Sequence, residues 1–461
     1  MLIQLTVGHF RSFQEPQTLD MVAVTPFKEH PEHCIETGRR DAPKLLKSSV
    51  IYGPNAAGKS NWIQAMGVMK KIVVESAKWQ SGDPIPVDPF LFDPEDEGEP
   101  SLFEVVFISN KVRYQYGFTA TKERVEEEWL YSFGKAGERE AKRTWIERGR
   151  DVESGEEIWN CPAIQKMEGK RNLTLYQEKT RNNALFLSTA IQLNSPSMEP
   201  VFGWFRDKLR IRIDTPGEEE SVLPVKTWEA CREERGREWA LVFLKLADAS
   251  ISHLDIDVEI IPRTNWGAPS MKELLGRFEG GRVMMNQKVL DGATIGSYMA
   301  ASSKIVEGET SSLIKRPWDA ESVGTHKMFL LAGYWLELLN QGLVLFIDEL
   351  DNSLHHKLVR ALFDLVHDTR TNPQGAQLIA TTHDVALLDS DLLRRDQIWM
   401  IEKGNDLGSE LYPISDFDVR EEYAFQKRYL NGRYGALPIL PRLVGKSGLD
   451  SGRKKRKGPE E

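Results

Sequence analysis

The sequence predicts an α/β fold in which buried strands carry their polar residues at one edge of a sheet. Two short apolar runs lead to this expectation: Ser49–Tyr52 stops abruptly at Gly53, and Leu343–Ile347 stops at Asp348. Open α/β sheets bind ligands at the carboxyl ends of such strands. A third run, Leu2–Val7, alternates apolar and polar residues and predicts an edge strand of the same sheet.

Length and composition indicate a large globular protein with more than one structural unit. The 461 residues are 40% hydrophobic, which is enough for a sizeable core. The formal net charge is -9 and the sequence pI is about 5.7, so the whole chain has no strong electrostatic preference for nucleic acid or an anionic membrane. Any contact with DNA would have to be local.

Cysteine usage and hydropathy predict a cytoplasmic protein. Cys34, Cys161 and Cys231 lie far apart and form no C-x-x-C pair, which argues against a disulfide framework and a zinc knuckle. The first residues lack the basic and apolar segments of a signal peptide. No run approaches the roughly 18 to 20 apolar residues that span a membrane.

A phosphate-binding loop connects the first buried strand to a helix. Residues 53–60 read G-P-N-A-A-G-K-S and match G-x-x-x-x-G-K-[ST], and apolar residues at helical spacing follow. Backbone N–H groups of such a loop surround phosphates, while Lys59 reaches the β- and γ-phosphates and Ser60 coordinates Mg²⁺. The alternative, a chance glycine-rich turn, does not explain the flanking elements. The residues expected to contact the nucleotide are Gly53, Asn55, Gly58, Lys59, Ser60 and Asn61.

Two acids after Leu343–Ile347 are expected to complete a hydrolytic site. Asp348 would join the Mg²⁺ shell, and Glu349 would polarise the attacking water. A tandem Asp-Glu separates this class from small GTPases, in which a distant glutamine orients the water. A strand that simply ends in solvated acids is the alternative, and the phosphate loop weakens it.

The order of the motifs resembles that of ABC-type ATPases related to SMC, RecF and OLD proteins. The phosphate loop is followed by E-S-V-G-T at 321–325, L-F-I-D-E-L-D-N-S-L-H-H at 345–356 and A-T-T-H-D at 380–384. More closely, the chain is similar to standalone ATPases of prokaryotic anti-phage and abortive-infection systems, of the PARIS AriA-like or RloB-associated kind. Further matches to these ATPases lie at 127–131, 394–399 and 429–438. The resemblance implies a P-loop NTPase of ABC/SMC type with a helical insertion.

In this family a second copy completes each nucleotide site. Ser322 and Gly324 resemble the signature segment, which binds the γ-phosphate of the ATP held by the opposite subunit. A hydroxyl, a glycine N–H and a helix dipole all favour an anion. Val323 and Thr325 depart from the commoner L-S-G-G-Q, so a plain helix cap at Ser322 is the alternative.

Three further residues acquire roles through the resemblance. His383 resembles the switch histidine that contacts the γ-phosphate, and Asp351 lies in the loop that crosses to the partner site. Arg11, in F-R-S-F, resembles an arginine that contacts phosphate or adenine. A structural histidine and a surface arginine are the alternatives. Gln192 is a candidate for the glutamine loop of the family.

The expected domain organisation has an ATPase core made from both ends of the chain. The ranges are 1–132 for the N-terminal lobe, 133–300 for a mainly helical insertion with some core elements, 301–415 for the C-terminal lobe, and 416–461 for a C-terminal element with a basic tail. Within the first lobe, 103–107 and 112–118 predict two antiparallel strands joined around Asn110. The tail cluster GRKKRKG at 452–458 predicts a solvated end, with a nucleic-acid contact as the alternative.

The resemblance implies an ATPase that uses ATP and Mg²⁺ and serves as the sensor or scaffold of an anti-phage system. Association of two or more cores would control an effector from a neighbouring gene, such as a Toprim-type or RloB-like nuclease, and no membrane partner is expected. The alternative is a RecF- or SMC-like repair ATPase that binds DNA. A transporter subunit is disfavoured by the long insertion and the atypical signature.

Overall fold

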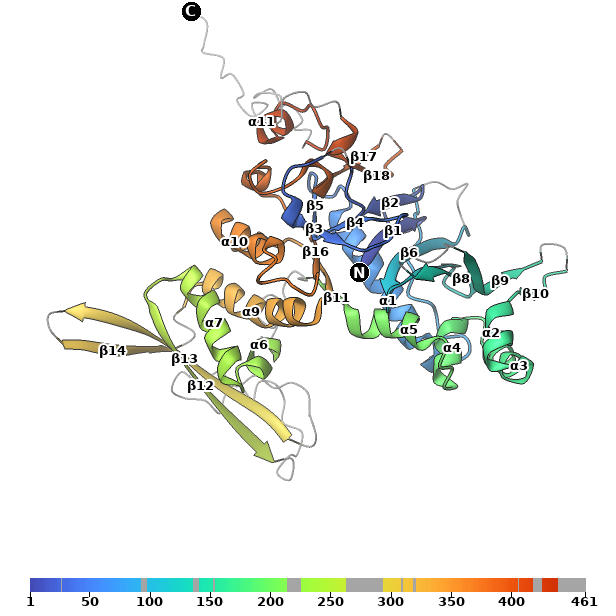
Figure 1. Cartoon of the computed structure of the whole chain (residues 1–461), viewed down its shortest axis with the longest axis horizontal. Coiled ribbons are helices and arrows are strands. Elements are labelled where there is room, and N and C mark those ends of the chain that lie inside the picture. Colours follow the sequence, from blue (N-terminus) through green and yellow to red (C-terminus); the bar gives the residue numbers. More distant parts are fainter. Residues whose placement is uncertain are drawn as a thin grey trace, which may run out of the picture.

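The computed structural model describes most of the chain, in which two large sheets have helices between and around them (Figure 1). The described residues are 1–25, 27–92, 98–135, 141–151, 154–213, 225–262, 293–307, 310–317, 321–404, 406–417 and 425–437. The basic cluster at 452–458 lies outside them. Among the described helices, none is both long and apolar enough to cross a bilayer.

The N-terminal part forms a seven-stranded antiparallel sheet with the order β10-β9-β8-β7-β6-β1-β2. Its strands are β1 (Leu2–Gly8), β2 (Gln17–Asp20), β6 (Ser101–Ser109), β7 (Val112–Ala120), β8 (Val125–Lys135), β9 (Lys142–Arg150) and β10 (Glu157–Trp159). The predicted pair at 103–107 and 112–118 is confirmed as β6 and β7. They join through Asn110 and Lys111, whose φ angles of 51° and 65° suit a two-residue hairpin turn.

A six-stranded sheet carries the motif-bearing strands in the order β11-β15-β16-β5-β17-β18. These are β11 (Leu209–Arg212), β15 (Val344–Ile347), β16 (Gln377–Thr381), β5 (Ser48–Tyr52), β17 (Ile398–Lys403) and β18 (Ser409–Pro413). All neighbours are parallel except β17 and β18. Val344 and Phe346 pack in the core on one face, and Leu345 and Ile347 in the core on the other. Two-sided burial explains why the run is continuously apolar.

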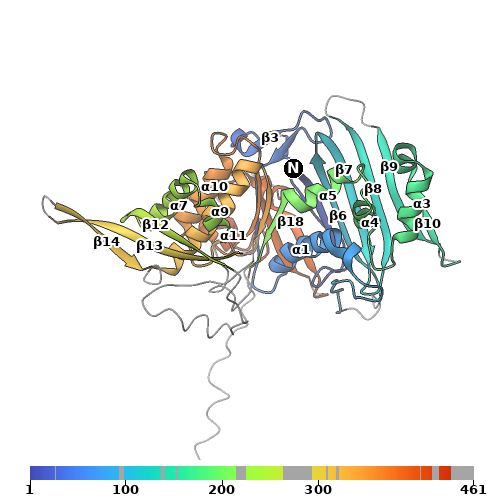
Figure 2. The same ribbon diagram turned by 90° about the horizontal axis from the view of Figure 1, so that it is seen from below.

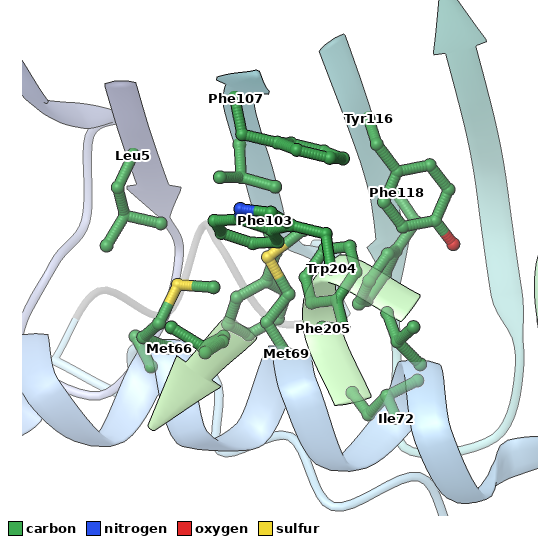
Figure 3. Packing of buried hydrophobic residues seen from close by; sticks show 14 of the residues in the cluster. Leu5, Met66, Met69, Ile72, Phe103, Phe107, Tyr116, Phe118, Trp204 and Phe205 are labelled. Carbon is green, nitrogen blue, oxygen red and sulfur yellow. The ribbon is translucent and has the colours of Figure 1, made fainter. Parts of the chain in front are cut away.

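Helix α1 (Lys59–Glu75) lies between the two sheets (Figure 2). Its buried face meets the antiparallel sheet and the short π-helix η4 (Trp204–Lys208), and the rings of Phe107 and Trp204 stack with centroids 4.3 Å apart. Figure 3 shows this core, whose labelled members are Leu5, Met66, Met69, Ile72, Phe103, Phe107, Tyr116, Phe118, Trp204 and Phe205. Burying each large apolar side chain stabilises the fold by about 1.5–3 kcal/mol. The position of the phosphate loop, which precedes α1, therefore depends on this packing.

Helices cover the other face of the six-stranded sheet. They are α6 (Val225–Ala230), α7 (Glu234–Ala247), α9 (Val323–Gln341) and α10 (His356–His367). Beyond α7, a three-stranded antiparallel sheet extends away from the body (Figures 1 and 2). Its strands are β12 (Ile251–Pro262), β13 (Ala293–Glu307) and β14 (Thr310–Pro317).

The remaining elements are short. At the β9–β10 end of the antiparallel sheet lie α2 (Pro162–Glu168) and α3 (Lys170–Lys179), whereas α4 (Phe186–Gln192) and α5 (Glu199–Gly203) lie closer to α1. Strands β3 (Cys34–Glu36) and β4 (Lys44–Leu46) pair with each other. Short helices complete the described chain: η1 (Pro31–His33), η2 (Ser76–Lys78), η7 (Val385–Leu387), η8 (Arg395–Gln397), η9 (Ile414–Asp416) and α11 (Phe425–Leu430).

The prediction for Leu2–Val7 is wrong in two respects. Strand β1 does not share a sheet with Ser49–Tyr52, and it lies between β2 and β6 instead of at an edge. Alternation of apolar and polar residues indicates only that one face of a strand is more buried than the other. An interior strand of an antiparallel sheet gives the same pattern as an edge strand.

The described residues of 133–300, predicted as a mainly helical insertion with some core elements, contain both helices and strands. Strands β9 and β10 extend the antiparallel sheet, and β11 joins the sheet that carries the motifs. In Lys142–Arg150 the charged residues lie mostly on the more exposed positions, while Trp145 and Ile146 are buried. Because most residues of this segment are charged and only two adjacent apolar residues are buried, the sequence does not show the alternation that predicts a strand.

Glu128 of β8 ties α4 to the antiparallel sheet. Its completely buried carboxylate accepts hydrogen bonds from Phe186 N at 2.6 Å, Leu187 N at 3.0 Å and the Tyr116 hydroxyl at 3.0 Å. Burial raises the pKa of Glu128, and the charge of Arg148, 3.9 Å away, opposes this shift. The hydrogen bonds and the charge of Arg148 therefore offset part of the cost of burying this carboxylate.

Glu128→Ala is expected to lower the free energy of unfolding by about 3 kcal/mol, because two buried N–H groups lose their acceptor and the buried Arg148 loses a nearby negative charge. Glu127→Ala, at the exposed neighbouring position, should change it by less than about 0.5 kcal/mol. Urea unfolding of both variants measures the difference. Equal losses would show that Glu128 contributes no more than a surface residue.

Candidate functional site

The three motif-bearing loops leave the same edge of the six-stranded sheet. Strands β5, β16 and β15 are parallel neighbours, with β16 in the middle. Gly53 follows β5, Asp348 follows β15, and Thr382 follows β16. The parallel register therefore brings the phosphate loop, the two acids and the histidine segment to one place.

Two glycines of the phosphate loop are fixed by their neighbours. A Cβ atom on Gly53 would lie 2.3 Å from the carbonyl oxygen of Ile401. Gly58 has φ of +112°, and its Cβ would lie 2.6 Å from the Ser409 hydroxyl and 2.7 Å from the Ser12 hydroxyl. Only glycine fits both positions without displacing the backbone or the neighbouring strands.

Ser12 and Ser409 support the loop, and sequence reasoning missed both of them. The Ser409 hydroxyl donates to the Ala57 carbonyl at 2.6 Å, and Ser409 N donates to the Ser12 carbonyl at 2.6 Å. Asn61 Nδ2 donates to the Ser12 hydroxyl at 2.9 Å. Ser12 lies in the F-R-S-F segment, and this motif was the only feature of the sequence that pointed to it. The serine of this segment, and not its arginine, contacts the phosphate loop.

Lys59 supplies a positive charge inside the loop. Its ammonium donates to the carbonyl oxygens of Gly53 at 2.8 Å and Pro54 at 3.0 Å, and its side chain is buried. Burial lowers the pKa of Lys59 to about 8, and nearby carboxylates, Asp348 foremost, oppose the shift. An anion bound at the loop would favour the charged form of the lysine.

The other predicted loop residues differ in exposure. Ser60 is half-buried in the first turn of α1, and Asn55 is exposed. Asn61 is half-buried and engaged with Ser12. Ser60 is thus the hydroxyl of the loop that a metal ion could reach, beside the N-terminus of a helix.

Thr381 positions both acids. Its hydroxyl donates to Asp348 Oδ1 at 2.5 Å and accepts from Glu349 N at 2.8 Å. The parallel pairing of Ile347 with Ala380 puts Thr381 beside Asp348. Sequence reasoning missed this threonine, because only the register of the two strands reveals it. Asp348 is buried, and its second carboxylate oxygen makes no hydrogen bond among the described residues.

Glu349 and His383 lie together at the surface. Glu349 has φ of 45°, which turns the chain sharply after β15. His383 Nε2 lies 3.7 Å from Glu349 Oε1, and these side chains are 38% and 45% exposed. His383 N lies 3.2 Å from the carboxylate of Asp351. The structure therefore brings three predicted site residues into direct contact.

The segment 322–325 caps helix α9. Thr325 N donates to the Ser322 hydroxyl at 3.1 Å, and the two hydroxyls lie 2.8 Å apart. A Cβ atom on Gly324 would lie 3.1 Å from the Ser353 carbonyl oxygen, so the start of α9 touches the loop after β15. Val323 is 66% exposed. The helix cap named as the alternative is present, and the contact with a second copy's ATP stays a prediction.

Arg11 pairs with an acid of its own lobe. Its guanidinium lies 2.9 Å from Asp88 Oδ2, and Arg11 N donates to the Asp88 carbonyl at 2.7 Å. The guanidinium also lies 5.5 Å from the centroid of the Phe10 ring. Gln192 is the last residue of α4. Contact of Arg11 or Gln192 with a nucleotide stays a prediction.

The residues present fit a nucleoside triphosphate with Mg²⁺. The loop places a buried cation, Lys59, next to backbone that only glycine can form. Ser60 and Asp348 offer the hard oxygen donors that Mg²⁺ prefers. Thr381 occupies one oxygen of Asp348 and leaves the other for a ligand.

Comparison with known protein families identifies one match. The profile of the family described as "AAA domain, putative AbiEii toxin, Type IV TA system" matches residues 48–154 and 231–389, which is more than half of the chain. The matched ranges include the phosphate loop, Ser322, the two acids and His383. No curated protein sequence matches the chain significantly.

Solved structures show distant likenesses. The SMC head domain from Thermotoga maritima is 13% identical over 89% of this chain and 98% of its own, with a TM-score of 0.36. The recombination mediator protein RecF is 11% identical over 89% of this chain and 98% of its own, with a TM-score of 0.29. Likenesses at this level carry no functional argument.

Gly58→Ala is expected to lower the free energy of unfolding by about 1–3 kcal/mol and to weaken ATP binding, because alanine is strained at this φ and its Cβ meets Ser12 and Ser409. Gly67→Ala, inside α1, is the matched control. Its Cβ would meet nothing closer than 3.8 Å, so it should stabilise the chain by up to about 1 kcal/mol. Urea unfolding and ATP titration of both variants measure the effects. Gly58→Ala with unchanged stability and ATP affinity would contradict the fixed geometry of the loop.

ATP affinity is expected to fall as the pH rises above about 8. The folded-state pKa of Lys59 lies near 8, below its ordinary value of 10.5, so the protonated form that attracts phosphate is lost in this range. If only that form binds, Kd should rise about fivefold between pH 8 and pH 9. Lys59→Arg keeps its charge throughout and should remove this slope, whatever its absolute affinity. Calorimetric titration with ATP at several pH values measures Kd for both proteins. If Kd rises with pH equally in the wild type and in Lys59→Arg, the titrating group is not Lys59.

Proposed function

Because the chain belongs to the family of AAA domains whose profile it matches, we propose that it is an ATPase whose nucleotide site is completed by a second copy of the chain. One observation carries the proposal. Glu349 and His383 lie in contact at the surface, half exposed to solvent, just after β15 and β16, at the sheet edge that also carries the phosphate loop. A water-activating carboxylate in so open a position gains from a cover that excludes bulk water.

The surface around these residues is suited to such a cover. Asp351 contacts the backbone of His383, and Ser353 touches Gly324 at the start of α9. Val323 projects from the same helix start with 66% of its surface exposed. Burying this side chain against a second copy would contribute about 1.5–3 kcal/mol to association. The signature segment, the Asp351 loop and the histidine thus form one continuous surface.

In the proposed reaction, each residue has a defined task. Lys59 and the backbone N–H groups of the loop hold the β- and γ-phosphates of the substrate ATP, and the start of α1 adds a positive dipole. Mg²⁺, held by Ser60 and Asp348, would neutralise phosphate charge. Glu349 orients the attacking water and accepts its proton, while Thr381 keeps the backbone of Glu349 in place. Catalysis then rests on positioning and charge stabilisation.

We assign this cycle to a cytoplasmic sensor or scaffold of a prokaryotic anti-phage system. The family description names a "putative AbiEii toxin, Type IV TA system", which supports a role in defence. Association with ATP would hold a separately encoded effector, and hydrolysis would change its release. In the described part of the chain, the one grouped set of metal-type ligands contains a single carboxylate, Glu32. A two-metal nuclease needs several carboxylates, which favours an effector on another chain.

Glu349→Gln is expected to bind ATP, to lose hydrolysis by about 100-fold or more, and to accumulate as an ATP-bound dimer or larger assembly, because the water loses its base while the phosphate contacts remain. Asp364→Asn, on the exposed face of α10, is the matched control and should behave as the wild type. Light scattering with and without Mg-ATP gives the mass, and phosphate release gives the turnover. Co-expression with the neighbouring gene product tests for the effector.

Adding Val323→Asp to Glu349→Gln tests ATP binding and the association of two copies separately. The double variant should still bind ATP but stay monomeric, because a carboxylate would be buried at the interface. Full turnover by Glu349→Gln would exclude Glu349 as the base. ATP-dependent assembly that requires duplex DNA and weakens with salt would favour a DNA-repair ATPase instead.

A further inference from the structure

Tyr52 is a buried tyrosine directly before the phosphate loop. It is the last residue of β5, 1% of its surface is exposed, and Gly53 follows it. Within the part of the chain that the structure describes, its hydroxyl has no hydrogen-bond partner. Such groups are rare, because a buried donor without an acceptor destabilises the state that contains it. The place of this donor, beside the proposed ATP site, indicates that a partner engages it in another state of the protein.

The Tyr52 side chain lies among the loops that carry the proposed catalytic residues. It belongs to the core on the α9 and α10 side of the sheet, together with Leu350 of the loop after β15 and Leu387 of η7, which follows β16. Thr382 N donates to the Ile51 carbonyl at 3.2 Å, so the chain after β16 is hydrogen-bonded to the residue that precedes Tyr52. A movement of either loop therefore changes the surroundings of the Tyr52 ring.

Two carboxylates act on the Tyr52 hydroxyl. Burial raises the pKa of Tyr52 well above its ordinary range, and the charges of Asp384 and Asp351 add to the rise. The hydroxyl therefore stays protonated near neutral pH and can donate a hydrogen bond. Asp384 directly follows His383, and Asp351 lies two residues after Glu349. The acids that influence this donor thus belong to the segments that carry the proposed catalytic residues.

Asp384 offers an unused acceptor. Its Oδ1 accepts from Ala386 N at 2.9 Å and thereby caps η7. Its Oδ2 makes no hydrogen bond among the described residues. Asp351 differs, because its two carboxylate oxygens lie 3.3 and 3.2 Å from His383 N. An unpaired donor and an unpaired acceptor therefore belong to two neighbouring segments, and Asp384 is the first candidate as the partner of the Tyr52 hydroxyl.

Binding of ATP would change the contacts of both segments. The Lys59 ammonium donates to the carbonyl oxygens of Gly53 at 2.8 Å and Pro54 at 3.0 Å. These two residues directly follow Tyr52. Phosphate oxygens compete for the same N–H groups and form stronger, charge-assisted hydrogen bonds with them. In the neighbouring segment, the His383 side chain is 38% exposed at the same edge of the sheet, so it can turn toward a γ-phosphate.

We propose that, in the ATP-bound protein, the Tyr52 hydroxyl donates to Asp384 Oδ2 and so holds His383 toward the γ-phosphate. Tyr52 is then a positioning residue, because it does not touch ATP and acts through the segment 382–384. ADP has no γ-phosphate to attract His383, so it leaves the hydroxyl unpaired. The inference rests on the proposed ATPase function and on the role of His383 in it.

The C-terminal element closes the core around Tyr52. The ring of Tyr429 in α11 lies 6.3 Å from the Tyr52 ring, centroid to centroid, and its hydroxyl donates to the Ala436 carbonyl at 2.9 Å. Ala436 N donates to Glu402 Oε2 of β17 at 2.7 Å. These bonds give the segment 429–437 a structural task. Of the two neighbouring tyrosines, one has a hydroxyl with a partner in the described chain, and the other has not.

The test compares Tyr52→Phe with the wild type as full-length proteins. Phenylalanine keeps the buried ring and removes only the hydroxyl. Without nucleotide, the Tm of the variant should be equal or higher, because no hydrogen bond is lost in that state. With Mg²⁺ present, calorimetric titration should show that the affinity for ATPγS falls about tenfold while the affinity for ADP stays the same. A purely structural role of the hydroxyl would not change the ratio of the two affinities.

Two further variants identify the partner and control for stability. Asp384→Ser keeps an oxygen that can cap η7 but lacks Oδ2, so it should also lower the ATPγS affinity about tenfold. Combined with Tyr52→Phe it should cause no further loss, because both changes remove the same hydrogen bond. Tyr429→Phe is the matched control. It loses the bond to Ala436, so it should lower the Tm and leave the ratio of the ATPγS and ADP affinities unchanged.

Two outcomes would overturn this inference alone. If Tyr52→Phe lowers the nucleotide-free Tm as Tyr429→Phe does and leaves the affinity ratio unchanged, the hydroxyl has a structural partner such as a buried water. If the losses of ATPγS affinity in Tyr52→Phe and Asp384→Ser are additive, the two side chains do not share a hydrogen bond. A wild type that binds neither ATPγS nor ADP would instead overturn the proposed ATPase function, and this inference with it.

Discussion

The hydrogen bonds of Thr381 fix the geometry on which the rest of the site depends. The backbone N–H of Glu349 can only donate to the threonine oxygen, so the hydroxyl proton must point to Asp348. One side chain thereby sets the direction of both acids. It can do so because three parallel strands keep their register, and a slip of β16 by one residue would turn this hydroxyl to the opposite face of the sheet. The two cores on either side of the sheet oppose such a slip.

The parts of the site that the sequence predicts are those with a local chemical reason. Gly58 and Lys59 follow from a contiguous pattern, and Asp348 follows from an apolar run that needs burial on both faces. The parallel sheet, α1 and α9 appear where periodicity and motif placed them. Thr381 could not be found in this way. Threonine is common at strand ends, and its importance arises only from a neighbour in a separate strand.

Other features could not be predicted from the sequence because they depend on pairing between distant segments. The alternation of Leu2–Val7 is compatible with any half-buried strand, so it does not reveal that β1 and β5 belong to different sheets. The charges of β9 conceal a strand that has one solvated face.

The pairing of β5 also governs the order in which the chain can fold. Val50 pairs with Ala380 on one side and with Ile398 on the other. The strand before the phosphate loop therefore has no partner in its sheet until the chain has been synthesised past residue 381, and it lacks its second partner until past residue 400. Gln377 likewise bonds the backbone of Leu2. Non-local contacts of this kind slow folding and leave apolar strands exposed on the ribosome. The antiparallel sheet, whose strands all precede residue 160, can assemble first and shelter α1 until the remainder arrives.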